Sequence, residues 1–203
     1  MNTWDQLAEE AVIVKTVTAL KANGIEARIV ATGVEAKEEV LAMLPKGAEV
    51  MTMSSVTLET IGLVQEINES GKYDAVKPKL SAMDRKTRGA EMRKIGAAPD
   101  WAIGSVQAVS EDGHLLIASN TGSQLPAYAY GSGNVIWVVG TQKIVRTLDE
   151  GMKRIYEYVM PLEDVHMHTL YGVGTAVNKV LIINKEFMPN RAMVIFVKER
   201  LGY

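Results

Sequence analysis

The stretch of sequence that most constrains the fold contains no charged side chain. It runs from Leu115 to Gln142 and lacks Asp, Glu, Lys and Arg over 28 residues, although these types make up 23% of the chain. Its length would suit a membrane span, but four glycines, Pro126 and several amide and hydroxyl side chains would leave polar groups unsatisfied in lipid. We interpret it as two strands buried on both faces, residues 115–119 and 135–140, joined by a polar loop. Such a loop is where a ligand would bind.

Composition limits the class of protein and of partner. With 203 residues, of which 47% are hydrophobic, the chain can bury one substantial core, and we expect residues 1–203 to form a single domain. A net charge of -2 predicts no general attraction to nucleic acid or to an anionic membrane. The absence of cysteine excludes a cysteine nucleophile and thiolate-held zinc or iron–sulfur sites within this chain. The acidic N-terminal segment is not typical of a signal peptide, which indicates a cytoplasmic protein.

Hydrophobic periodicity predicts alternating helices and strands in the first third of the chain. Residues 1–23 are expected to form an N-terminal helix that stops at Asn23-Gly24, followed by a strand over 25–32. Thr32 and Glu35 form a capping-box pattern at the start of a second helix. A strand over 48–53 then leads into a third helix. This order calls for parallel strands with right-handed crossovers.

The later segments add an antiparallel element. Residues 102–110 and 113–120 are expected to be strands of a hairpin, because Glu111-Asp112-Gly113 lies between two apolar runs. A helix that starts near Leu148 is expected to end at Pro161, and two more strands are expected within residues 180–199.

Four ordered segments resemble one known family. They are MTMSSVTLETIGL (51–63), the run from Ser105 to Gly131, VIWVVGTQKIV (135–145) and YVMPLED (158–164). Together they resemble the LUD-domain family, the lactate-utilisation proteins. Members of that family look like the superfold of ribose-5-phosphate isomerase, glucosamine-6-phosphate deaminase and CoA-transferases. The resemblance implies a three-layer αβα fold of the α/β class with a mixed, mostly parallel sheet, CoA-transferase-like, without fixing a function.

The resemblance also suggests partners. Some members of the family are implicated in lactate oxidation alongside iron–sulfur partner proteins, and some carry a cysteine-rich region. This chain has no cysteine. If it takes part in such a system, the clusters belong to other subunits and its own role is binding or scaffolding.

The hydroxyls of Ser54, Ser55 and Thr57 lie between an expected strand and helix. Free backbone N–H groups there would hold a phosphate or carboxylate, and the alternative is that these side chains only cap the helix. The basic segment Lys77–Lys94 offers a counter-charge, with Arg88 as the first choice because a guanidinium pairs with an oxyanion in a fixed fork. The alternative for Arg88 is a solvated helix face.

Glu111 is a candidate nucleophile. Ser110-Glu111-Asp112-Gly113 resembles the Ser-Glu-Asn-Gly signature of CoA-transferases, in which the glutamate forms a covalent acyl intermediate, with Asp112 replacing the asparagine. A hairpin turn needs the same residues and would leave Glu111 exposed at its tip. The turn is the favoured interpretation.

The best candidate binding segment is the loop that leaves the first buried strand. It presents hydroxyl, amide and backbone N–H groups at a strand end, where open α/β sheets bind ligands, and it consists of Asn120, Thr121, Gly122, Ser123 and Gln124. Lys143 directly follows the second buried strand and is expected at the same mouth. It would either bind an anion or cover the strand end with its stem.

Other sites are not supported by spacing. His166 and His168 have a spacing that a strand could use for a metal, but no third ligand is fixed, so we interpret them as surface histidines and predict no metal site. The glycines at 131 and 133 precede a strand, so they do not form a dinucleotide fingerprint, and no P-loop is present. The sequence identifies no cofactor.

Three functions remain open from sequence. The first is a protein that binds a small anionic metabolite, such as a hydroxy acid, a sugar phosphate or an acyl thioester, at the strand ends. The second is a non-catalytic accessory subunit of an iron–sulfur redox assembly. The third is an acyl- or CoA-transferring enzyme that uses Glu111. Homodimerisation is expected from its frequency among proteins.

Overall fold

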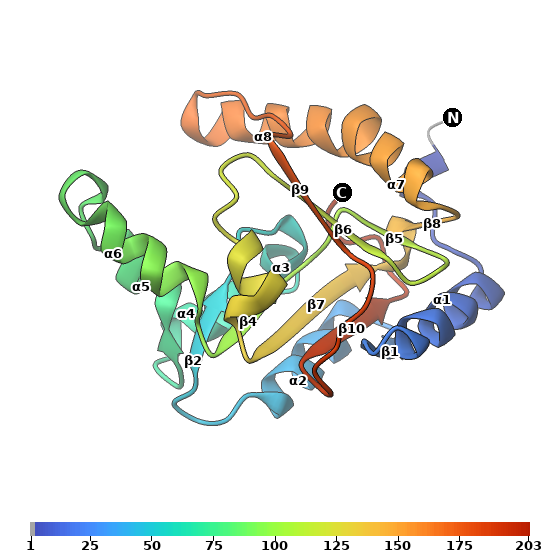
Figure 1. Cartoon of the computed structure of the whole chain (residues 1–203), viewed down its shortest axis with the longest axis horizontal. Helices are drawn as coiled ribbons and strands as arrows, with labels where there is room; N and C mark the ends of the chain where they lie inside the picture. Colours follow the sequence, from blue (N-terminus) through green and yellow to red (C-terminus); the bar gives the residue numbers. More distant parts are fainter. Residues whose placement is uncertain (1–2) are drawn as a thin grey trace.

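A parallel six-stranded sheet forms the centre of the molecule (Figure 1). The computed structural model describes residues 3–203. Its strands run in the order β1-β10-β7-β4-β2-β3, and each neighbouring pair is parallel. Their bounds are β1 (Glu26–Val30), β10 (Ala192–Val197), β7 (Asn134–Gly140), β4 (Trp101–Gly104), β2 (Glu49–Thr52) and β3 (Asp74–Ala75).

A second sheet of four strands holds the antiparallel pairs. Its order is β8-β5-β6-β9, where β6 is antiparallel to both of its neighbours and β5 is parallel to β8. The strands are β8 (Ile144–Val145), β5 (Ala108–Ser110), β6 (Leu115–Ser119) and β9 (Lys179–Ile183). The hairpin predicted around Glu111-Asp112-Gly113 is confirmed between β5 and β6. The predicted antiparallel pairs therefore lie in this second sheet, and the central sheet is entirely parallel.

Helices lie on both sides of the parallel sheet, which confirms the predicted three-layer αβα arrangement (Figure 1). No helix among residues 3–203 has the length and apolar character needed to span a membrane. The α-helices are α1 (Glu10–Ala22), α2 (Gly33–Met43), α3 (Val56–Thr60), α4 (Leu63–Glu69), α5 (Val76–Ser81), α6 (Arg85–Ala97), α7 (Leu148–Arg154) and α8 (Met160–Tyr171). Shorter turns are the 3-10 segments η1 (Thr3–Asp5) and η3 (Thr141–Lys143) and the π-helical segments η2 (Ala127–Gly131) and η4 (Ile155–Val159).

Both faces of β7 are buried. Val135 and Val139 belong to one apolar cluster, together with residues of α1 and of the second sheet. Ile136 and Val138 belong to another, together with residues of α2, α3 and α4. Because successive side chains of a strand point to opposite faces, a strand between two cores shows no polar alternation. This confirms the interpretation of residues 135–140.

The second sheet is also packed on both sides. Leu115 and Ile117 of β6 join the cluster beneath the central sheet, whereas Leu116 packs with Ile155 on the other face. Thus the predicted strand at 115–119 is confirmed and is buried for the same reason as β7. The segment from α7 to α8 covers this sheet on its outer face (Figure 1).

The N-terminal helix is shorter than predicted. The helix expected over residues 1–23 starts at Glu10, because Glu9 has an extended backbone, and residues 1–2 lie outside the described part of the chain. The preceding segment is held elsewhere: the Trp4 ring lies 6.3 Å from that of Tyr158, and the Trp4 carbonyl accepts a hydrogen bond of 3.2 Å from Arg154. These contacts attach the segment to the α7–η4 region.

Two other predicted elements differ in the structure. Residues 102–110 were expected to form one strand, but they contribute β4 to the central sheet and β5 to the second sheet. Pro161 does not end its helix. It lies in the first turn of α8, directly after the π-helical segment η4, where a missing N–H costs little.

Candidate functional site

Four neighbouring parallel strands end at one edge of the central sheet, and polar segments follow each of them. Met53–Ser55 follows β2, Ser105 follows β4, Thr141–Lys143 follows β7, and Gly202–Tyr203 comes after β10. Residues from all four segments line a cavity of about 420 Å³. The carboxyl ends of parallel strands are the usual ligand-binding edge of an open α/β sheet.

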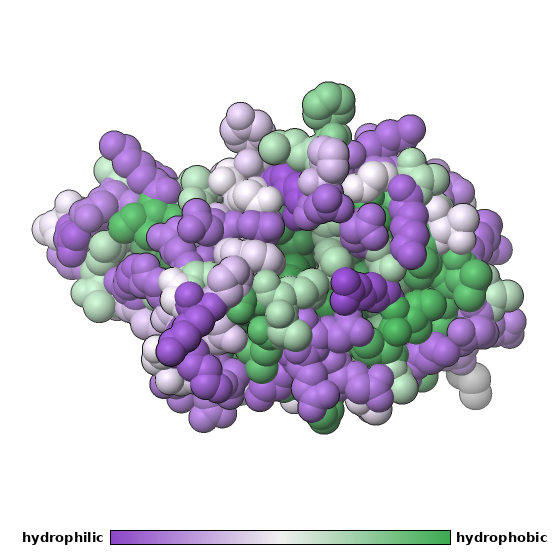
Figure 2. All heavy atoms as spheres, turned by 90° about the horizontal axis from the view of Figure 1, so that it is seen from below, coloured by the Kyte–Doolittle hydropathy of each residue, from purple (hydrophilic) through white to green (hydrophobic). Residues whose placement is uncertain are grey.

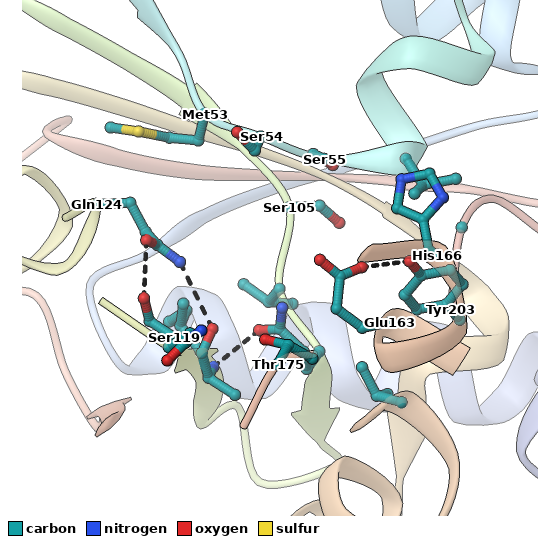
Figure 3. A pocket seen from close by; sticks show the side chains of 18 of the residues that line it. Met53, Ser54, Ser55, Ser105, Ser119, Gln124, Glu163, His166, Thr175 and Tyr203 are labelled. Carbon is teal, nitrogen blue, oxygen red and sulfur yellow. Dashed lines mark hydrogen bonds between the residues drawn. The ribbon is translucent and has the colours of Figure 1, made fainter. Parts of the chain in front are cut away.

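The opposite walls come from the second sheet and from α8. Figure 3 shows Ser119 and Gln124 on one side of the cavity and Glu163, His166 and Tyr203 on another. Ser119 Oγ donates a hydrogen bond of 3.0 Å to Gln124 Oε1, which fixes the amide at the end of β6. The cavity therefore lies between the two sheets, under α8.

Lys143 is the most unusual residue of the site. Its side chain is 2% exposed, and its Nζ donates hydrogen bonds of 3.0 Å to Thr57 Oγ1 and 3.1 Å to Ser105 Oγ. Among residues 3–203, no ion pair includes Lys143. Burial, together with the positive charge of Arg154, lowers the pKa of Lys143 to about 7.

Arg154 places a second buried cation near the cavity. Its guanidinium donates to the carbonyl of Gln107, a residue that lines the cavity, and it lies 5.2 Å from the centre of the Tyr158 ring. Burial lowers the pKa of Arg154 to about 10, although the side chain stays charged near neutral pH. Two buried cations without a paired carboxylate make this region favourable for an anion.

Lys77 brings a third cation to the cavity wall. Its Nζ donates a hydrogen bond of 3.4 Å to Ser54 Oγ. Burial lowers the pKa of Lys77, and the carboxylate of Glu59 opposes that shift. In the described chain, Lys77 takes part in no ion pair. Lys77 is the residue of the basic segment 77–94 that reaches the cavity.

A hydrogen-bonded tyrosine and glutamate form the wall of the cavity beneath α8. Tyr203 donates a short hydrogen bond from its hydroxyl to the carboxylate of Glu163, and both residues line the cavity (Figure 3). Burial, together with this bond to Glu163, raises the pKa of Tyr203, so its hydroxyl stays protonated at neutral pH. His166, one turn further along α8, also lines the cavity.

The predicted hydroxyl cluster lies at the cavity. Ser54, Ser55 and Thr57 all line it, and Ser55 also caps α3 by accepting a 3.4 Å hydrogen bond from the Leu58 amide. Thr57 Oγ1 donates to the Leu201 carbonyl at 3.1 Å. One of the three hydroxyls is thus used as a cap, and another joins two segments of the cavity wall.

The loop after β6 lies at the cavity in large part. Asn120, Thr121, Ser123 and Gln124 line it, but Gly122 does not. Gly122 has a φ of 84° and donates its amide to Ser119 Oγ at 2.8 Å. Its contribution is the shape of the turn, because a side chain is strained at this backbone angle.

Arg88 and Glu111 lie away from the cavity lining. Arg88 forms a two-pronged ion pair with Glu91 on α6, the helix that extends from the body in Figure 1. Glu111 accepts a 2.7 Å hydrogen bond from Lys15 of α1, beside the hairpin turn. Arg88 is thus paired with Glu91, and Glu111 is paired with Lys15.

Several residues of the cavity were not among the candidates chosen from sequence, and they are Lys77, Ser105, Glu163, His166, Thr175 and Tyr203. Lys77 begins the predicted basic segment, in which Arg88 was preferred, and Ser105 was assigned to the interior of a strand. For Ser105 a signal was present, because it directly follows Gly104, the true end of β4. For Tyr203 there was none.

The two histidines do not form a metal site in this structure. His166 lines the cavity, whereas His168 Nδ1 lies 2.9 Å from the Asp164 carbonyl oxygen on α8. Within residues 3–203, no group of three or more metal-ligating side chains lies close enough to hold an ion.

The fold and the cavity define an α/β protein with room for a small ligand at the carboxyl ends of its parallel strands. The chain belongs to the LUD domain family, whose model matches residues 13–197. It is similar in structure to a DUF162 family protein from Deinococcus radiodurans, with a TM-score of 0.58 and 13% sequence identity over 95% of this chain and 99% of that chain. At this identity the likeness shows the fold alone. No curated protein matches the chain.

Proposed function

We propose that this LUD-domain protein binds a small anionic metabolite in the cavity at the strand ends. The observation that supports the proposal is that Lys77 and Lys143 both line the cavity and that neither is in an ion pair in the described chain. Cations that lose part of their hydration are normally paired, because the loss otherwise costs free energy. An anion bound at the half-buried Lys77 would supply its missing partner and a counter-charge in the cavity that the buried Lys143 also lines.

The size of the cavity favours some of the expected ligands over others. A volume of about 420 Å³ is at the lower end of the range for ligand sites, roughly 300–1,000 Å³. A hydroxy acid or a sugar phosphate fits within it, whereas a whole CoA ester would extend beyond it. Glu111, the nucleophile of the acyl-transfer hypothesis, bonds Lys15 outside the lining of this cavity and therefore takes no part in the binding proposed here. A role in lactate utilisation is compatible with a hydroxy acid ligand.

Thermal unfolding in the presence of single anions tests this proposal. The panel contains lactate, inorganic phosphate, ribose 5-phosphate and acetyl-CoA. A ligand at a hundred times its dissociation constant stabilises the folded state by about 2.7 kcal/mol. Binding of lactate or a phosphate should raise the midpoint in the natural protein, and the rise should be reduced in Lys143→Met. The proposal fails if no member of the panel raises the midpoint.

A second candidate function, as an accessory subunit of a redox assembly, is favoured by the outer side of α8. Val165 on this helix and Val173 just after it are 66% and 54% exposed. Figure 2 views the molecule from below, the side away from α8 in Figure 1, and there hydrophobic side chains lie in several separate patches between hydrophilic ones. Copurification with an iron–sulfur protein that is lost on Val165→Asp would support this function. A complex that survives the substitution would remove α8 as its interface.

A further inference from the structure

The surroundings of the Lys143 amine consist of hydroxyl groups. Thr57 Oγ1 donates its own hydrogen to the Leu201 carbonyl at 3.1 Å, so towards Lys143 it acts as an acceptor. Ser105 Oγ provides the second acceptor at 3.1 Å. A neutral amine has two hydrogens and one lone pair. These two acceptors engage both hydrogens and leave the lone pair without a partner among the residues that the structure describes.

The neutral amine is well populated at this position. Because burial lowers the pKa of Lys143 to about 7, this amine is unprotonated in roughly half of the molecules at neutral pH. An ordinary lysine, by comparison, is unprotonated to less than about one part in a thousand. Buried lysines with lowered pKa values are the lysines that react with carbonyl groups.

The space beside the amine is kept open by a glycine. A Cβ at Gly202 would lie 3.5 Å from Lys143 Nζ and 2.6 Å from Thr57 Oγ1. Gly202 also has a φ of 61°, which a side chain would strain. The small residue therefore leaves room for a ligand atom next to the nitrogen.

The anionic end of a ligand has a separate place to bind. Lys77 and Ser54 form a hydrogen-bonded pair in the wall of the same cavity. If this pair holds the anion, the negative charge does not lie directly against Lys143, whose amine can then remain neutral.

We propose that Lys143 is a nucleophile that forms an imine with a small carbonyl compound carrying an anionic group, such as a 2-oxo acid or a phosphorylated aldehyde. The proposal rests on the proposed function, because it uses the same cavity. Nζ adds to the carbonyl carbon, an N–C bond forms as the C=O π bond breaks, and one amine hydrogen moves to the carbonyl oxygen to give a carbinolamine. The hydroxyl then leaves with the remaining amine hydrogen as one water molecule. Ser105, beside the nitrogen, is placed to relay the proton.

Reductive capture on the full chain tests the imine. The protein is incubated near pH 7 with pyruvate or glyceraldehyde 3-phosphate and cyanoborohydride, and the modified lysine is located by peptide mass mapping. Each captured molecule should add its own mass less one oxygen. Capture at Lys143 should be on the order of a hundredfold faster than at the exposed Lys153 of α7, because far more of its amine is neutral. For each probe, the capture rate at Lys143 is divided by the rate at Lys153. The probe with the larger ratio indicates whether the site prefers a 2-oxo acid or a phosphorylated aldehyde.

Two variants complete the test. Lys153→Arg should leave the capture rate at Lys143 unchanged, since residue 153 is exposed and outside the cavity lining. Lys143→Arg keeps a positive charge but has no such amine, so fast capture should disappear. Equal capture at Lys143 and Lys153 in the natural protein would overturn the imine, and this result does not depend on how a variant folds. If phosphate still raised the unfolding midpoint in that case, anion binding would stand without the covalent step.

Discussion

Lys143 Nζ lies 3.0 Å from Thr57 Oγ1, although 86 positions separate the two residues in the chain. The same threonine hydroxyl donates to the carbonyl of Leu201, 144 positions away. One hydroxyl thus connects the segments that follow β2, β7 and β10. The same side-chain atom therefore contacts the Lys143 amine and joins two segments of the cavity wall.

Replacing Thr57 by valine should therefore destabilise the protein. The change removes two hydrogen bonds, although the Leu201 carbonyl still accepts from Gln142 and the Lys143 amine still donates to Ser105. A single hydrogen bond contributes about 0.5–1.5 kcal/mol, so the free energy of unfolding should fall by about 1–2 kcal/mol. Urea denaturation measures the change. Thr57→Ser keeps the hydroxyl, so its free energy of unfolding should fall much less. An equal fall in both variants would show that the packing of the methyl group matters and the hydroxyl does not.

The stability of the fold should rise with pH because of Lys143. Its folded pKa of about 7 lies below the ordinary value of 10.5, so the unfolded chain binds the proton more tightly. Between these pH values only the unfolded state holds that proton, and the free energy of unfolding gains about 1.4 kcal/mol per pH unit. Below pH 7 both states are protonated, and the full cost of the buried charge is present.

Lys143→Met isolates this contribution. The difference in unfolding free energy between the variant and the natural protein should be largest below about pH 7 and should shrink as the pH approaches 10. Arg154 should not disturb this range, because its folded pKa is about 10 and it stays charged below that value. A difference that is constant from pH 6 to pH 10 would mean that Lys143 is not the group that loses its proton.

The sequence predicts those parts of the fold that depend on local patterns. The hairpin at Asp112-Gly113 and the cap of α2 by Thr32 each depend on a few adjacent residues. The elements that were assigned wrongly depend on distant partners. Residues 102–110 divide between two sheets because β4 pairs with β7 while β5 pairs with β6, and no local pattern distinguishes these neighbours.

The site was predictable only where a residue directly follows a strand. Ser54 lies in the segment between β2 and α3, and Lys143 ends the short turn after β7, so their positions at the ligand edge follow from the order of strands. Arg88 was preferred for its chemistry, but sequence does not show which way a basic helix faces, and its actual partner is Glu91. Tyr203 reaches the cavity through a contact with Glu163, 40 positions away, which no spacing rule indicates.

Lys77 and Arg88 offer a matched comparison for anion binding. Both belong to the same basic segment, but Lys77 lines the cavity and Arg88 is paired with Glu91 outside its lining. Lys77→Gln should weaken phosphate or lactate binding about tenfold, equivalent to about 1.4 kcal/mol, because a charge-assisted hydrogen bond is lost. Arg88→Gln should leave the dissociation constant unchanged. Titration calorimetry at low salt measures both, and the reverse order of effects would move the anion site to α6.

The attachment of α8 over the cavity should depend on the bond between Tyr203 and Glu163. No side chain of α8 is buried, so this helix has few packing contacts to hold it in place. Tyr203→Phe removes the hydroxyl and should lower the free energy of opening by about 1 kcal/mol, which corresponds to roughly fivefold faster hydrogen exchange of the α8 amides.

Thr169→Ala is the control, because the Thr169 hydroxyl donates only to Val165 within the same helix, so exchange should change little. The burial that raises the pKa of Tyr203 keeps its hydroxyl protonated, and the effect should therefore persist at neutral pH. Unchanged exchange in Tyr203→Phe would show that the continuous helix through η4 holds α8 without this bond.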